Sequence, residues 1–491
     1  MNRKEPIAIR TLEQVLMDNN ITKGKSLCDA DMSGADFSGL ESKNQDFTNC
    51  KLAGVNFEGA ALAGANFTNA DLSGANFSEA YLVGANFTGA NLEGASLEKA
   101  DLEDAVIDSA KMGGAKYIAA NLMGASLKQV IGSNVAFDNA CMIRADLKGS
   151  HLVSSSFVAA KMKKAVMNNC NIDRSDLTDA EMFMADLSNA CMRNAILERT
   201  VLNQAIMTKA DLLGANMSHA SVIKASLGNT TLANALLTSA DFSDSDLAKA
   251  DLSNATLHST NFTRAKLTLA ELNGQYFSDS TLTATDFTGA KLCGADFSHV
   301  NLKGAVFTGA DLKGAIFVKS NLDGVSLEHA DCSGADFTST SMKHAICNGA
   351  VMKGARLVEI NGLGICLSKS VLTATKIFES DLSQADLQGS VIEKAYIEDV
   401  DFSEANLAGL DFTRSIVTKT SMKKALLSDS NFANTSLYGI DFTDADMLNA
   451  DLCGTDINKC NFTNVDMQTV KKTEPLRTKN LLNGKNVDLS Y

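Results

Sequence analysis

The chain has 491 residues and a formal net charge of −14, with 2 Pro, no Trp and 45% hydrophobic residues. This apolar content is enough for a substantial core and excludes wholesale disorder. Because contacts to phosphates need a surplus of Lys and Arg, the negative charge argues against nonspecific binding to nucleic acid. No apolar run approaches the roughly 18 residues that a membrane-spanning helix needs.

Residues 1–26 do not share the pattern of the rest of the chain, and we expect them to form an N-terminal capping segment. Residues 5–21 predict a short helix, since Leu12, Val15 and Leu16 make an apolar stripe at helical spacing. A partner-binding helix is the alternative. The segment has no continuous apolar stretch of the signal-peptide type. It therefore predicts a cytoplasmic protein, with secretion by a system that needs no signal peptide as the alternative.

Residues 27–469 follow a five-residue repeat, Ala-(Asp/Asn)-(Leu/Phe)-X-(Gly or a similar residue), of which residues 70–74 and 310–314 are clear copies. From Leu27 to Met467 the central residue of each repeat has a number ending in 2 or 7 and is apolar or sulfur-bearing with three exceptions, and the residue two places before it is small with seven exceptions. The register never slips, so no loop interrupts the repeat. The central positions that are neither apolar nor sulfur-bearing are Ser42, Gly132 and Gly362.

A period of five fits neither an amphipathic helix nor a simple strand. Two inward residues in every five predict short extended segments joined by tight corners, which coil into an all-β solenoid. Of the Phe pairs, 12 lie 20 residues apart, 11 lie 10 apart and one lies 15 apart. Identical rings stack when they lie above one another, so the number of sides is even, and two sides cannot enclose a core. We therefore predict four sides per coil.

This pattern resembles the pentapeptide-repeat family, whose consensus is Ala-(Asp/Asn)-Leu-X-X, over residues 27–467. The resemblance implies a right-handed quadrilateral parallel β-helix with 20 residues per coil. About 22 such coils, at roughly 4.8 Å per stacked strand, would form a rod on the order of 105 Å long. The resemblance implies no single function, because members of the family do several different things.

Residues 470–491 leave the repeat and contain the second of the two Pro residues. The ends of a solenoid expose strand edges, which pair with other chains unless they are covered. We expect this segment to be a second cap, a dimerisation arm or a flexible end. A homodimer formed through one end of the rod is one consequence of the second alternative.

Residues 29–110 hold 14 acidic and 3 basic residues, whereas residues 111–390 hold 26 acidic and 25 basic ones. One interpretation is solubility, since charge keeps a long repetitive surface from aggregating. The other interpretation is an acidic face that binds a protein partner. The candidate residues of this face are Asp29, Asp31, Asp36, Glu41, Asp46, Asp71, Glu79, Glu93, Glu98, Asp101, Glu103, Asp104 and Asp108.

One place inverts the order of small and large inward residues, at Ile360, Gly362 and Ile365. A bulky side chain is expected to refill the volume that Gly gives up there. Local repacking or a bulge is the first interpretation of this place, as it is for Gly132. An irregular notch at which a partner docks is the alternative.

Catalysis needs titratable groups that converge in a pocket, and we expect no such pocket in a filled four-sided coil. No His stacks on a Cys one coil away, so the sequence predicts no zinc-type ligand set either. We therefore expect no catalytic residues, no metal site and no cofactor. The 11 Cys are scattered along the chain and are expected to stay reduced.

These expectations predict a non-enzymatic, rod-shaped scaffold whose long faces bind a protein partner. The resemblance implies two alternatives. Some pentapeptide-repeat proteins present acidic rods that resemble B-form DNA and occupy the DNA-binding saddle of type II topoisomerases such as gyrase. Others are associated with bacterial secretion systems, as adaptors, structural parts or cargo. The electrically balanced middle of this chain weakens the first alternative.

Overall fold

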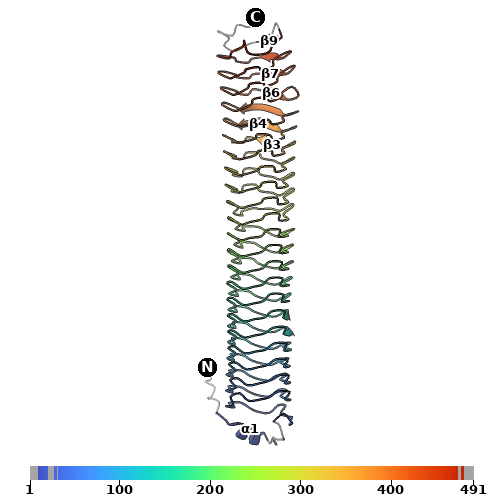
Figure 1. Cartoon of the computed structure of the whole chain (residues 1–491), viewed down its shortest axis with the longest axis vertical. Coiled ribbons are helices and arrows are strands. Elements are labelled where there is room, and N and C mark those ends of the chain that lie inside the picture. Colours follow the sequence, from blue (N-terminus) through green and yellow to red (C-terminus); the bar gives the residue numbers. More distant parts are fainter. Residues whose placement is uncertain (1–8, 20–26, 30, 474–476, 480–491) are drawn as a thin grey trace. The chain divides into compact units, whose positions relative to one another are not determined.

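The chain divides into two compact units, a first unit, Met1–Thr256, and a second unit, Leu257–Tyr491. In each unit the chain winds into flat coils that stack on one another (Figure 1). Almost all regular structure in both units is this stack, and helix is confined to the N-terminal end of the described chain. The computed structural model describes residues 9–19, 27–29, 31–473 and 477–479.

Stacked coils pair as parallel strands, and the offset between paired residues is constant along the repeat. Asp71 pairs with Asn91 in the first unit, and Asp311 pairs with Asp331 in the second. Each coil therefore holds four copies of the repeat and has four sides, each with one central residue in the interior. The structure is the parallel β-solenoid that the sequence predicts. The predicted number of coils is not confirmed, because the two units are described separately and neither holds that many.

Four tight corners join the sides of each coil. The corner residue carries a number ending in 4 or 9, and between residues 34 and 464 its φ lies between 49° and 72°. Arg414 is the one exception in this range, all of which the structure describes. Glycine adopts such a left-handed conformation without steric cost. This explains why many repeats, such as the one that ends at Gly74, close with Gly.

The interior consists of stacked central side chains. Phe297 and Phe317, which lie on the same side of successive coils, stack with ring centroids 5.0 Å apart and planes inclined by 6°. Phe297 and Phe307, which are half a coil apart and thus on opposite sides, meet edge to face at 5.7 Å. Rings from opposite sides therefore touch, and side chains fill the space that the ribbon encloses. Both arrangements are favourable for aromatic rings.

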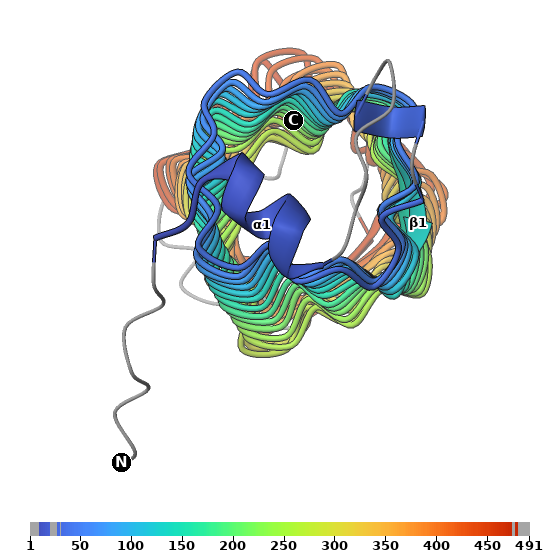
Figure 2. The same ribbon diagram turned by 90° about the horizontal axis from the view of Figure 1, so that it is seen from below.

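A short helix, α1 (Leu12–Asp18), lies across the open end of the first coil in Figure 2. The side chains of Thr11 and Gln14 form a capping box that starts this helix. Val15 and Leu16 are its buried residues. The predicted N-terminal helix is thus confirmed over seven residues. The prediction of residues 5–21 is too long, because residues 9–11 and 19 are not helical; residues 5–8, 20 and 21 lie outside the described residues.

The chain on both sides of α1 bonds to the edge of the first coil. The Arg10 N–H donates to the Gly39 carbonyl, and the Glu41 N–H donates to the Arg10 carbonyl, both at 2.9 Å. The Asn19 side-chain amide bonds both the N–H and the carbonyl of Asp36 at 2.8 Å. These bonds occupy backbone groups that an uncovered strand edge leaves free.

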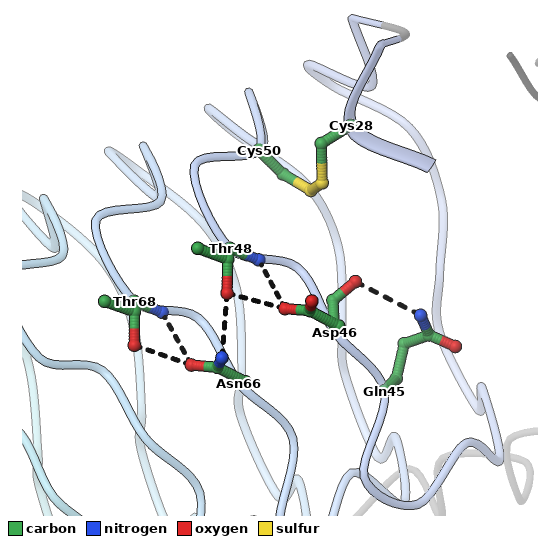
Figure 3. The surroundings of a disulfide bond; sticks show 7 residues. All are labelled: Cys28, Gln45, Asp46, Thr48, Cys50, Asn66 and Thr68. Carbon is green, nitrogen blue, oxygen red and sulfur yellow. Dashed lines mark hydrogen bonds between the residues drawn. A yellow bond between two sulfur atoms is a disulfide. The ribbon is translucent and has the colours of Figure 1, made fainter. Parts of the chain in front are cut away.

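A disulfide joins Cys28 to Cys50 beside the first coils (Figure 3). The expectation that the cysteines stay reduced is wrong for this pair. That expectation rested on the scattered positions of the Cys residues in the sequence. Cys28 lies in the 3-10 turn η1 (Leu27–Asp29), before the regular ladder begins, and its partner is 22 residues away. The other nine cysteines have free thiols.

Most sides are so short that one bridge joins each coil to the next, and longer strands occur mainly in the second unit. Seven of them form one parallel sheet in chain order. The last strand belongs to the predicted tail, and its offset from its neighbour is one residue longer than the regular offset. The strands are β1 (Ile131–Ser133) and β2 (His151–Val153) in the first unit, and β3 (Arg356–Val358), β4 (Lys376–Asp381), β5 (Tyr396–Asp401), β6 (Ile416–Thr418), β7 (Ser436–Tyr438), β8 (Asp456–Asn458) and β9 (Arg477–Lys479) in the second.

Larger neighbours fill the space at the two glycines that replace central residues. A Cβ atom at Gly362 would lie 3.4 Å from the Ile365 side chain, and one at Gly132 would lie 3.0 Å from the Val135 side chain. Ile360 and Ile365 are 2% and 1% exposed. The ladder also continues through Gly362. These observations support local repacking at both places, and the docking notch stays a hypothesis.

Tyr117 offers a test of the interior packing. Its ring stacks on Phe137 at 5.0 Å, and its fully buried hydroxyl has no hydrogen-bond partner. Burial also raises the pKa of this hydroxyl. Since Tyr117→Phe keeps the ring and removes the unpaired group, we expect the free energy of unfolding to rise by about 1 kcal/mol in denaturant titrations. Tyr81→Phe, at a half-exposed site, is the control and should change nothing. A less stable Tyr117→Phe variant would contradict this account.

The disulfide can be tested by alkylation of the native chain. Without reductant, iodoacetamide should leave Cys28 unmodified, and digestion should release a peptide pair linked through Cys50. After reduction, Cys28 should be alkylated, and the unfolding free energy should fall by roughly 3 kcal/mol, the loop-closure effect of a short loop. Cys170 is the internal control and should stay unmodified before and after reduction while the chain is folded. Its thiol is buried, and burial is the main cause that raises its pKa to about 12. Equal alkylation of Cys28 before and after reduction would refute the disulfide.

Candidate functional site

One backbone N–H group in each repeat has no place in the ladder. In the repeat around Leu72, the N–H groups of Leu72 and Gly74 donate to the next coil, and that of Asp71 donates to the previous coil. The N–H of Ser73 donates instead to the Asp71 carboxylate, 3.2 Å away. Asp and Asn readily form such turns with the residue two places on. The Asp or Asn of the repeat therefore satisfies a donor that would otherwise destabilise the fold.

We call the residue before each central residue the outer position. Where this position lacks Asp or Asn, the preceding coil can supply the acceptor. Asp108 accepts from the N–H of Lys128 at 2.9 Å and from the hydroxyl of Ser126, at the outer position, at 2.6 Å. Asp173 accepts from the N–H of Arg193 at 3.0 Å in the same way. These carboxylates complete the hydrogen bonding of the ladder besides adding charge.

The predicted acidic residues do not gather on one side of the first unit. The constant offset between stacked coils assigns each of them except Asp29, which lies in η1 before the ladder begins, to one of the four sides. The side chain of Asp29 lies outside the described residues. The groups on the four sides are Asp46 and Asp108; Asp31, Asp71 and Glu93; Asp36, Glu79 and Glu98; and Glu41, Asp101, Glu103 and Asp104.

Several of these carboxylates have partners within the chain. Asp36 lies 3.0 Å from the Arg10 guanidinium. Partial burial raises the pKa of Asp36, but hydrogen bonds from Ser38 and the charge of Arg10 outweigh this effect and lower it. Hydrogen bonds from Thr48 lower the pKa of Asp46 (Figure 3). Such groups stay ionised at neutral pH, and part of their charge is used inside the chain.

A different surface stands out in the second unit. On the side formed by β3 to β6, the outer positions hold Arg356, Lys376, Tyr396 and Ile416 in register, and we call these four residues the β3–β6 row. Tyr396 and Ile416 are 47% and 52% exposed. Sequence reasoning missed this row. The available signal was an apolar residue at outer positions where the repeat prefers Asp or Asn.

The described residues show no group of three or more His, Cys, Asp or Glu side chains that could hold a metal ion. In the same part of the chain, no helix has the length and apolar character to cross a membrane. The half-buried Cys191 is a poor nucleophile at neutral pH, because burial, followed by its hydrogen bond to Asp173, raises its thiol pKa to about 11.

Comparison with known proteins finds one matching family. The family model described as pentapeptide repeats (8 copies) matches residues 46–116, 140–274, 280–318, 320–357 and 380–468 in adjoining or overlapping segments. No curated protein matches the chain.

Among solved structures, the chain is similar to HetL, a pentapeptide repeat protein involved in heterocyst differentiation regulation from the cyanobacterium Nostoc sp. The two are 20% identical over 59% of this chain and 89% of HetL, with a TM-score of 0.19. A trypsin-treated variant of QnrB1, a plasmid-mediated fluoroquinolone resistance protein, is 20% identical over 42% of this chain and 90% of its own, with a TM-score of 0.24. The PL6 family alginate lyase AlyGC is 9% identical over 97% and 99%, with a TM-score of 0.23. Likeness at these TM-scores carries no argument about function.

The structural role of Asp108 can be tested by removal and rescue. Asp108→Ala leaves the N–H of Lys128 and the hydroxyl of Ser126 without their acceptor, so the free energy of unfolding should fall by about 1–3 kcal/mol. In the double variant Asp108→Ala/Ser126→Asn, an Asn at the outer position caps the Lys128 N–H as it does elsewhere, and most of the loss should be recovered. Denaturant unfolding measures both. Equal stability of the single variant and the unchanged chain would argue against a structural role.

Proposed function

Because this chain belongs to the pentapeptide-repeat family, we propose that it is a scaffold that binds a partner protein through outward-facing side chains of its coils. The β3–β6 row carries this proposal. It places a half-exposed Tyr beside a half-exposed Ile, next to Arg and Lys, on one parallel sheet. Tyr and Arg are enriched among the residues that dominate the energy of protein interfaces. The filled interior leaves the outer surface as the place for recognition.

The acidic residues of 29–110 support a partner-binding face less well. Their distribution over four sides gives no single surface of uniform potential, and several of them accept hydrogen bonds from their own chain. A mimic of duplex DNA for a type II topoisomerase needs such a surface. The solubility interpretation fits this distribution better. The β3–β6 row is also compatible with an adaptor role in a secretion system, since it does not distinguish a partner of that kind from another protein.

The proposal is tested by affinity pull-down from native cell lysate at low and at physiological salt, with mass spectrometry of the eluate. Tyr396→Ser/Ile416→Ser removes the apolar part of the row, and we expect the amount of partner recovered in the eluate to fall at least tenfold. Ile196→Ser/Ile206→Ser is the matched control, because these side chains have similar exposure at outer positions of the first unit. It should retain the partner.

The eluate also separates the alternatives. Topoisomerase subunits that disappear as salt rises would favour the DNA mimic, since exposed charge pairs are screened by salt. Proteins of a secretion apparatus that persist at physiological salt would make the scaffold an adaptor. An eluate without any specific protein, or equal recovery with both double variants, would contradict the proposed use of the β3–β6 row.

A further inference from the structure

The ladder of the second unit is interrupted on one side of one coil, between residues 389–394 and 408–413. One coil earlier, the same side is regular, because the N–H groups of Leu372 and Ala374 donate to the next coil at 2.7 and 2.9 Å. The corresponding N–H groups of Ile392 and Lys394 have no backbone acceptor, although the structure describes every residue around them. The N–H of Asp411, which should donate back across the same gap, is also without a backbone partner.

The interruption coincides with an altered corner. Arg414 is the corner residue whose φ is not left-handed, unlike the other corners between residues 34 and 464. The inward residue that follows, Ser415, is half-buried, whereas inward small residues are otherwise buried except near the two ends of the repeat. The Ser415 hydroxyl donates to the Ile392 carbonyl and accepts from the Ala395 N–H at 3.2 Å. The inward Ser175 and Ser245 make the same two bonds, so these contacts survive although the ladder beside them is broken.

Next to this side, in a stretch that the structure describes throughout, only the N–H groups of the corner residues Gly389 and Arg414 also lack their regular backbone acceptors. On the preceding side, the Leu387 N–H still donates to the Asn406 carbonyl at 2.9 Å. On the following side, Tyr396 pairs with Ile416 in register. Another interruption, between Thr281 and Asn301, keeps left-handed corners and buried inward residues. The opening near Arg414 therefore combines a broken ladder with a displaced corner.

A cavity of about 440 Å³ lies in this opening. Its lining includes Val391, Ile392 and Asp411, and an ion pair between Glu393 and Arg414 lies at its rim. Val391 is 48% exposed. It is the last of three valines stacked at outer positions of successive coils, after Val351 and Val371. An apolar strip thus leads directly to the opening.

The free groups of the opening have the pattern of a strand edge. One lip offers the N–H groups of Ile392 and Lys394 and the carbonyl of Ser390, and the other offers the N–H and carbonyl of Asp411 and the carbonyl of Thr413. Between the corners at Gly389 and Lys394, the first lip presents the Ser390 carbonyl and then the Ile392 N–H, the order in which a parallel strand edge offers its acceptor and donor to another main chain. Proteins use such edges to bind peptides, with main-chain bonds for affinity and side-chain contacts for selectivity.

We propose that this opening is a docking site for a short extended segment of a partner protein. The main chain of the segment pairs with the free N–H and carbonyl groups of the lips, and one of its apolar side chains packs on Val391 and Val371. The ion pair of Glu393 and Arg414 favours polar over strongly charged residues at the adjacent position. This inference deepens the proposed scaffold function, since it names the form in which a partner is bound.

The free chain provides the first test, by amide hydrogen exchange of the full-length protein. The amides of Ile392, Lys394 and Asp411 should exchange at least 100-fold faster than those of Leu372 and Ala374 on the regular side. Slow exchange of all five amides would overturn the proposal. This measurement needs no partner, so its failure is distinct from an empty pull-down, which would concern the proposed function.

The second test uses a phage-displayed library of random heptapeptides selected against the full chain. Selected peptides should protect the Ile392 and Lys394 amides. Arg414→Gly removes the ion pair with Glu393 of the preceding coil and leaves the corner free to become left-handed, so it should close the opening, slow these amides and weaken peptide binding at least tenfold. Lys424→Gly, at a regular corner with φ of 54°, is the matched control and should leave binding unchanged.

The peptide itself supplies the last control. Replacing its main-chain N–H groups by N-methyl groups removes the donors and keeps the side chains, and should abolish binding. Failure to select any peptide that protects these amides would overturn the proposal. Equal binding of the parent and the N-methylated peptide would overturn it as well.

Discussion

The structure depends on one unpaired donor. In a coil whose sides are single copies of the repeat, the parallel ladder and the corners leave the N–H after each central residue without a backbone acceptor. This N–H donates either to an Asp or Asn at the outer position, as Ser73 does to Asp71, or to a carboxylate of the preceding coil, as Lys128 does to Asp108. A buried or half-buried donor without a partner is costly. The preference of the repeat for Asp and Asn follows from this cost.

The same constraint makes outer positions without Asp or Asn informative. An apolar residue at such a position cannot accept the hydrogen bond, and its side chain faces solvent. Tyr396 and Ile416 in the β3–β6 row, and Val391 beside the open ladder, are such positions. An acidic residue does not mark such a position, because many carboxylates accept hydrogen bonds from the backbone N–H groups that they cap.

The periodic part of the fold could be predicted from the sequence, because inward residues, corners and ring columns all repeat with the coil. The four sides followed from the spacing of Phe residues, and Phe297 and Phe317 indeed stack. The same spacing also assigns the acidic residues of the repeat to sides. The prediction of one acidic face did not take this assignment into account.

Features that break the period were not accessible. Cys28 lies before the ladder, so no spacing rule links it to Cys50. The corner at Arg414 has no local signal either, since Arg174 and Arg199 occupy ordinary left-handed corners. The Arg414 side chain pairs with Glu393 of the preceding coil, a contact that a single repeat does not encode.

The constant offset between stacked coils has a consequence for how such a chain can change in length. Loss or gain of one whole coil leaves every later residue on its original side, so surface rows survive and only their distance from the ends changes. Loss or gain of a single repeat keeps the inward pattern but turns all later residues to the next side. Duplication in units of a coil therefore preserves a binding surface, whereas duplication in units of a repeat preserves the fold and disperses the surface.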